Sequence, residues 1–90
     1  MLITYTYRVT PEDGSFSIEC LENDSIFTCC FRREDIEPMT TEVTELMLED
    51  YAAAHSHPPI PAFRQPGPGE FQLTFELTTG RRVRPEKVKA

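Results

Sequence analysis

Carboxylates are the side chains of this 90-residue chain that could hold catalytic metal ions, so their spacing bears first on what the chain could catalyse. A nuclease that works with two metal ions needs several carboxylates in one cluster. The first strand-like segment, residues 3–9, contains none. The remaining acids outside the predicted helix include four that are spread over turns and separate strands: Asp13, Glu19, Asp24 and Glu76. We therefore expect solvated surface acids and no enzymatic activity.

His55 and His57 are the other candidate metal ligands, because only one residue separates them. A structural zinc site takes four nitrogen or sulfur ligands, and no run of further ligands lies beside this pair. A histidine at the end of a helix also interacts favourably with the negative end of the helix dipole. The chain has no Ser-His-Asp pattern and no glycine-rich phosphate loop. We expect no metal and no cofactor.

The three cysteines, Cys20, Cys29 and Cys30, point to a reducing compartment. An odd number argues against a disulfide framework, and the first residues do not resemble a secretory signal. Adjacent Cys29 and Cys30 would face opposite sides of a strand and are poorly placed to share a metal. No apolar run approaches ~20 residues, so no membrane span is predicted. We expect a cytoplasmic protein whose cysteines are small buried apolar side chains.

Charge is unevenly distributed along the chain. Residues 1–79 hold four basic and fourteen acidic side chains, a charge of about −10, whereas residues 80–90 carry +4. The acidic body should repel nucleic acid phosphates and attract a basic protein. Only the tail offers nucleic-acid contacts, through Arg81, Arg82, Arg84 and Lys87. The alternative is a solubilising terminus, so we expect weak or no direct nucleic-acid binding.

One helix is predicted over residues 34–54. Apolar residues recur at steps of three and four, which places them on one stripe that must be buried. Asp35 suits the N-cap, and Pro38 falls in the first turn, where its missing N–H costs little. The predicted inward stripe consists of Ile36, Met39, Val43, Leu46, Met47 and Tyr51.

Four strands are predicted from alternation of apolar and polar residues, over residues 2–10, 15–21, 26–31 and 71–77. A turn at residues 11–14 joins the first two strands, and a proline-rich loop covers residues 58–70. The predicted core joins the inward faces of all five elements: Tyr5, Tyr7, Phe16, Ile18, Phe27, Phe31, Val43, Leu46, Met47, Leu73 and Phe75.

These elements predict an α+β fold of order β-β-β-α-β, in one domain over residues 1–79 followed by a basic tail over residues 80–90. We expect a four-stranded mixed sheet of order 3-2-1-4, with the helix packed on one face and the fourth strand parallel to the first. Nothing is left to cover the other face, and both outer strands have an unpaired edge. We therefore expect a homo-oligomer, with strand four as the pairing edge.

Residues 3–77 resemble the HicB family of bacterial antitoxins. The resemblance rests on the first hairpin, with its Glu12-Asp13-Gly14-Ser15-Phe16 turn, on an acidic helix of similar length, and on the Pro59-Ile60-Pro61 that follows it. It implies a partial ribonuclease H fold and a role in binding and silencing a small basic mRNA-cleaving toxin of the HicA type. The ten residues after Gly80 are too few for the added DNA-binding domain of many members.

Two groups of acids are the candidate contacts for such a toxin. Glu42, Glu45 and Glu49 lie on the predicted outer face of the helix, and Asp13, Glu19 and Glu22 lie on or beside the second strand. Complementary charge would speed association with a basic partner. The alternative is an orphan regulatory or small-ligand-binding module of the same fold without a toxin partner.

Overall fold

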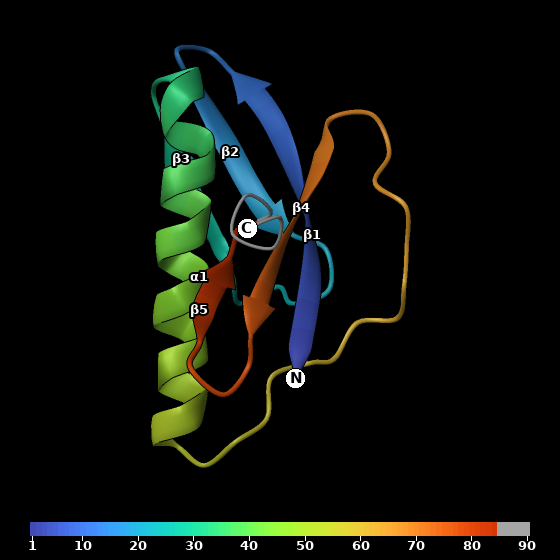
Figure 1. Cartoon of the computed structure of the whole chain (residues 1–90). Coiled ribbons are helices and arrows are strands. Elements are labelled where there is room, and N and C mark those ends of the chain that lie inside the picture. Colours follow the sequence, from blue (N-terminus) through green and yellow to red (C-terminus); the bar gives the residue numbers. More distant parts are fainter. Residues whose placement is uncertain (85–90) are drawn as a thin grey trace.

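A curled antiparallel sheet and one long helix make up the computed structural model, which describes residues 1–84 (Figure 1). Within these residues the strand order is β3-β2-β1-β4-β5. The strands are β1 (Leu2–Glu12), β2 (Ser15–Cys20), β3 (Phe27–Cys30), β4 (Glu70–Glu76) and β5 (Arg81–Val83). A 3-10 turn, η1 (Arg33–Asp35), leads directly into the helix α1 (Ile36–Ala53). The predicted α+β class is confirmed.

The first three strands form the predicted meander. Glu12 pairs with Ser15 across the first turn, where Gly14 has a φ of 80°, a conformation that glycine adopts without a Cβ clash. β2 and β3 are antiparallel as well. The inward faces predicted for β1, β2 and β4 are confirmed, because Tyr5, Tyr7, Ile18, Leu73 and Phe75 are all buried in the core.

β4 runs antiparallel to β1, so the predicted parallel pairing and mixed sheet are wrong. The prediction assumed that the helix alone returns the chain to the start of the sheet. Instead, the proline-rich loop after α1 (residues 54–69) runs back along the side of the sheet opposite the helix (Figure 1). The chain therefore enters β4 at the end of the sheet where the first hairpin lies. The loop also covers part of the face predicted to be bare, where Thr6 is fully buried.

A fifth strand extends the sheet beyond the four that were predicted. Gly80, with a φ of 72°, turns the chain after β4, and β5 pairs antiparallel with β4 from Arg81 to Val83. The first part of the predicted tail is thus part of the sheet. β4 is no longer an edge, so strand four as the pairing edge is also wrong; β3 and β5 are the edges.

The buried stripe of α1 is rotated from the predicted one. Its fully or nearly buried side chains are Thr40, Thr41, Thr44 and Leu48, whereas Leu46 is 55% exposed and Met39 is 37% exposed. One physical reason is Tyr7 on β1 below the helix, whose hydroxyl lies 2.7 Å from that of Thr44. A buried phenolic hydroxyl needs a hydrogen-bonding partner, which threonine supplies and leucine cannot.

The helix start also differs from the prediction. Asp35 has helical dihedral angles and makes no side-chain cap, because the 3-10 turn before it has already begun the helical path. Its backbone N–H donates to the Arg32 carbonyl at 3.0 Å. The side chain of Thr40 donates to the Ile36 carbonyl at 2.6 Å, so this buried hydroxyl is satisfied within the helix.

β3 shows the opposite face from the predicted one. Ile26 and Cys30 point into the core, while Phe27 is 67% exposed and Phe31 is 79% exposed. The turn before β3 sets this register: the Ile26 N–H donates to the Asn23 carbonyl, and the Ile26 carbonyl accepts the Cys20 N–H. A register that differs by one residue moves every side chain to the other face.

The core consists of ten buried side chains from four strands, the turn before β3 and the helix: Ile3, Tyr5, Tyr7, Ile18, Cys20, Ile26, Cys30, Leu48, Leu73 and Phe75. Phe16, Val43 and Met47 pack against this core while partly exposed. Phe27, Phe31 and Leu46 were wrongly placed in it. In the part of the chain that is described, no helix has both the length and the apolar character needed to cross a bilayer.

Candidate functional site

The outer side of α1 presents a stripe of alternating apolar and acidic side chains. Met39, Glu42, Leu46 and Glu49 follow one another at steps of three or four, so they line one side of the helix. All four are exposed. We call these four residues the outer helix face. The sequence of α1 contains five acidic residues and no basic one, so the charge of this surface is not neutralised from within the helix.

Glu45, the third predicted helix acid, has a structural role. Its Oε2 accepts the backbone N–H of Arg82 at 2.9 Å, and its Oε1 lies 3.7 Å from the guanidinium of Arg81. Glu45 therefore attaches β5 to the helix. Together with Glu42, Leu46, Glu49 and the turn at residues 79–81, it lines a hollow of about 180 Å³ beside the outer helix face.

Arg82 belongs to the same attachment. Its guanidinium lies 2.6 Å from the Glu37 carboxylate and donates to the Thr41 hydroxyl at 3.2 Å, and its side chain is only 10% exposed. Arg81 and Arg82, two of the predicted nucleic-acid contacts, are thus paired with carboxylates of α1. Arg84 is exposed, and Lys87 lies outside the described residues.

The second predicted group of acids is not brought together. Asp13 is exposed in the turn between β1 and β2. Glu19 is exposed on the sheet face opposite the helix, with its carboxylate 3.6 Å from Arg8. The Glu22 side chain lies against the backbone of Thr6 on β1 and is only 12% exposed. These three acids therefore do not share one surface.

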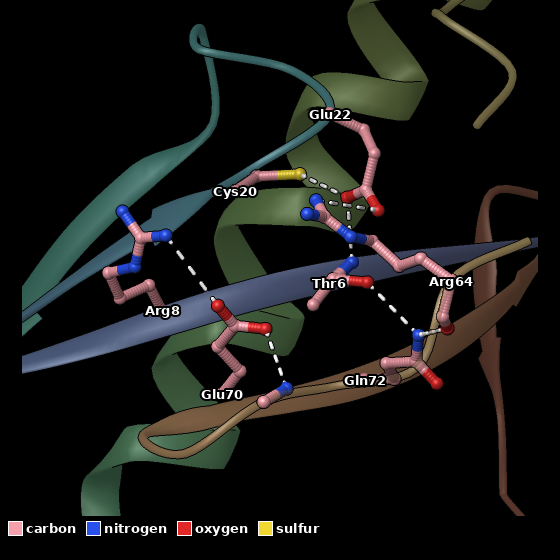
Figure 2. A network of polar contacts seen from close by, with 8 residues as sticks. Thr6, Arg8, Cys20, Glu22, Arg64, Glu70 and Gln72 are labelled. Atoms are coloured by element: carbon pink, nitrogen blue, oxygen red, sulfur yellow. Dashed lines mark hydrogen bonds and ion pairs between the residues drawn. The ribbon is translucent and has the colours of Figure 1, made fainter. Parts of the chain in front are cut away.

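Glu22 is the centre of a polar network on the sheet face opposite the helix (Figure 2). Its Oε1 accepts the backbone N–H of Thr6 at 2.7 Å and lies 3.7 Å from the Cys20 thiol. Its other oxygen, buried and without a hydrogen bond, lies 4.0 Å from the guanidinium of Arg64 on the proline-rich loop. The Gln72 amide donates to the Thr6 hydroxyl at 3.0 Å and to the Arg64 carbonyl at 2.8 Å. The network holds the loop against β1 and β4.

Cys20 in this network is not an activated nucleophile. Burial raises the pKa of its thiol to about 11, and the neighbouring Glu22 carboxylate adds to the rise. A thiol with a raised pKa carries little thiolate at neutral pH. The network therefore positions backbone and loop rather than supplying a reactive group.

Glu70 holds the end of the same loop (Figure 2). Its carboxylate accepts the Gly67 N–H at 2.8 Å and lies 3.6 Å from Arg8. The Gly67 N–H, assisted by the charge of Arg8, keeps the pKa of Glu70 below its ordinary value. The loop is thus fastened at both Arg64 and Gly67.

A groove of about 540 Å³ remains between this loop and the sheet. Its walls combine apolar side chains of the loop, such as Ile60 and Phe63, with polar side chains of the strands, such as Thr4, Gln72 and Thr74. The groove was not predicted, because the return path of the loop was not. Its size and mixed lining suit a small organic ligand.

Metal-ligating side chains do not cluster within residues 1–84, where no group of three or more His, Cys, Asp or Glu side chains could hold an ion. His55 and His57 are both exposed beyond the C-terminal end of α1. His55 has a φ of 55°, in the left-handed region where helices commonly end. Comparisons with protein-family models, with curated proteins and with solved structures found no match to this chain.

Proposed function

We propose that this chain is a non-catalytic, antitoxin-like protein of the cytoplasm that binds and neutralises a small basic mRNA-cleaving toxin of the HicA type. The observation that carries the proposal is the outer helix face, where Glu42 and Glu49 alternate with exposed Met39 and Leu46. A protein-binding surface commonly combines apolar side chains that are buried on contact with charges that select the partner.

The charge of the body selects a basic partner. Residues 1–84 hold seven basic and fourteen acidic side chains, a charge of about −7. Of the five acids of α1, Glu37 and Glu45 are paired with Arg82 and Arg81. Lysines and arginines of a partner would meet Glu42 and Glu49, while Leu46 between them would lose its contact with water. Met39 adds an adaptable apolar side chain at one end of the stripe. The proposal that the partner is a toxin rests on the resemblance of residues 3–77 to the HicB family. The proposal that the partner is basic rests on the acidic charge of this surface.

Co-expression tests this function directly. The reading frame adjacent to the one for this chain is expected to encode a small basic protein that arrests growth when expressed alone. Co-expression with this chain should restore growth, and the two proteins should purify together. Glu42→Lys with Glu49→Lys should abolish both effects. An adjacent product that is neither basic nor toxic, or rescue that survives the double reversal, would remove the proposal.

The groove under the proline-rich loop supports a second candidate, an orphan module that binds a small organic ligand. Its volume of about 540 Å³ lies within the range of ligand pockets in proteins. Thr74→Phe would fill the groove from the strand side. If a metabolite library contains a ligand that raises the melting temperature of the native protein but not of Thr74→Phe, this candidate replaces the antitoxin.

A further inference from the structure

The free edge of β3 is the strongest remaining interaction surface. Within residues 1–84, β3 pairs with β2 on one side and with no strand on the other. Phe27 and Phe31 are 67% and 79% exposed, and Cys29 between them is exposed as well. Aromatic side chains are rarely left on a bare strand edge, because such an edge can pair with another chain.

Backbone N–H and C=O groups of β3 also point toward this free edge. The Cys20 N–H donates to the Ile26 carbonyl, and the ladder continues through Ile18 opposite Thr28. Because hydrogen-bonded pairs alternate in an antiparallel ladder, the backbone groups of Phe27 and Cys29 point away from β2. The residues with exposed side chains are therefore also the residues with backbone groups available for a new strand.

We propose that β3 pairs antiparallel with β3 of a second copy of this chain, around a twofold axis at Cys29. In this register Cys29 lies opposite Cys29 of the second copy, and Phe27 lies opposite Phe31 at both ends. The sequence aromatic-x-Cys-x-aromatic reads the same in both directions, so an antiparallel copy places aromatic against aromatic. Cross-strand aromatic pairs of this kind stabilise sheets.

Charge selects a second copy over an unrelated strand. The edge segment, residues 25–31, carries no charged side chain and no proline. Exposed Asp24 precedes it and exposed Arg33 follows it. Within residues 1–84 the guanidinium of Arg33 lies 5.2 Å from the centre of the Phe16 ring and forms no ion pair with a carboxylate. An antiparallel copy brings Asp24 of each chain to the end where Arg33 of the other leaves the strand. The opposite edge, β5, instead carries the exposed charged side chain of Arg81.

The proposed pairing does not use the outer helix face. It replaces strand four, the predicted pairing edge of the homo-oligomer, with β3. The ten-strand sheet that results keeps both helices on one side, since the axis is perpendicular to the sheet. The two outer helix faces then remain accessible, so the dimer would present two sites for the proposed basic partner.

Light scattering on the purified chain gives the first test. The expected mass is about 21 kDa, twice the 10.3 kDa of one chain. Phe27→Lys with Phe31→Lys should halve this mass without changing the circular dichroism spectrum, because both side chains are exposed. Phe63→Lys, at an 87% exposed phenylalanine of the loop, is the matched control and should remain dimeric. A wild-type monomer, or a dimer that survives the double change, would overturn the proposal.

Disulfide trapping tests the register. Diamide accepts the two electrons and two protons that two Cys29 thiols lose as the S–S bond forms. Directly opposite residues of an antiparallel pair lie about 4.5–5.5 Å apart between Cα atoms, within the range that a disulfide spans. A covalent dimer is expected from wild type and not from Cys29→Ser. Trapping that persists in Cys29→Ser, or a noncovalent dimer that diamide does not trap, would contradict this axis.

Discussion

The side-chain oxygens of Tyr7 and Thr44 lie 2.7 Å apart inside the core, where they join β1 to α1. Both residues are essentially without solvent exposure. Burial raises the pKa of Tyr7 far above the ordinary tyrosine value, so this hydroxyl keeps its proton. This pair fixes which side of the helix faces the sheet, and so which residues of α1 remain outside.

Thr44→Val should destabilise the protein because it leaves the Tyr7 hydroxyl buried without its partner. A buried unsatisfied polar group costs about 1–3 kcal/mol. Tyr7→Phe should cost less, since the Thr44 hydroxyl can turn to a helix carbonyl. Urea denaturation of both single variants and the double variant forms a thermodynamic cycle. Strictly additive losses would show that the two hydroxyls do not act as a pair.

Leu48 and Leu46 test the rotation of the helix. Leu48 is 3% exposed, and Leu48→Ala should cost ~2–5 kcal/mol through the lost contacts and the cavity left behind. Leu46→Ala removes a mostly exposed side chain and should change stability by no more than about 0.5 kcal/mol. Melting temperatures of the two variants compare these effects directly. A larger loss of melting temperature in Leu46→Ala than in Leu48→Ala would mean that the predicted stripe, and not the observed one, packs against the sheet.

Glu70 should contribute to acid sensitivity. Its pKa is lowered in the folded protein, so its stabilising effect is complete above the unfolded value and is lost as pH falls through the lower folded value. Below about pH 4.5, the melting temperature of wild type should therefore fall more steeply with decreasing pH than that of Glu70→Gln. Glu12→Gln changes an exposed carboxyl of β1 and serves as the control. Equal acid sensitivity in wild type and Glu70→Gln would contradict the role of the Gly67 contact.

Gln72 should control how tightly the proline-rich loop is held. Gln72→Ala removes both amide hydrogen bonds, to Thr6 and to the Arg64 carbonyl. Trypsin cleavage after Arg64 should then become faster, while the melting temperature changes little, because loops open locally without global unfolding. Thr10→Ala, at an exposed position of β1, is the control. Unchanged cleavage would mean that other contacts hold the loop.

The sequence predicted the elements with the clearest periodicity. β1, β2 and β4 alternate over six residues or more, and their positions and inward faces were right. The helix was placed over residues 34–54 and is observed at Ile36–Ala53 after a 3-10 turn. In these strands alternate side chains point to opposite faces of the sheet, so the apolar residues at every second position mark the buried face. The face can therefore be predicted from each segment alone, without knowing which strand pairs with it.

β3, β5 and the direction of β4 could not be read from local pattern. Residues 26–31 are apolar at five of six positions, so alternation does not identify which face of β3 is buried. The turn at Asn23 determines the buried face. β5 has two arginines in three residues and forms because Glu37 and Glu45 attach it. The direction of β4 depends on the path of the loop, which contacts distant in sequence determine.

The candidate site was predicted in part. Charge alone pointed to Glu42, Glu45 and Glu49, and all three line one hollow. The exposed Leu46 among them was missed, because a leucine at helical spacing is normally assigned to the core. Burial of Thr40, Thr41 and Thr44 was missed for the converse reason. Their hydroxyls find partners in the Ile36 carbonyl, the Arg82 guanidinium and the Tyr7 hydroxyl, which the local pattern does not show.

Binding of the purified adjacent gene product, measured against salt, tests the central claim most directly. Wild type should bind with an affinity that falls as salt rises, since the contact is between acidic and basic surfaces. Glu42→Lys with Glu49→Lys should weaken binding by at least tenfold, about 1.4 kcal/mol. Glu12→Lys with Asp13→Lys makes the same charge change away from α1 and should alter binding much less. Equal losses in both double variants, or affinity indifferent to salt and to Glu42 and Glu49, would contradict the outer helix face as the site.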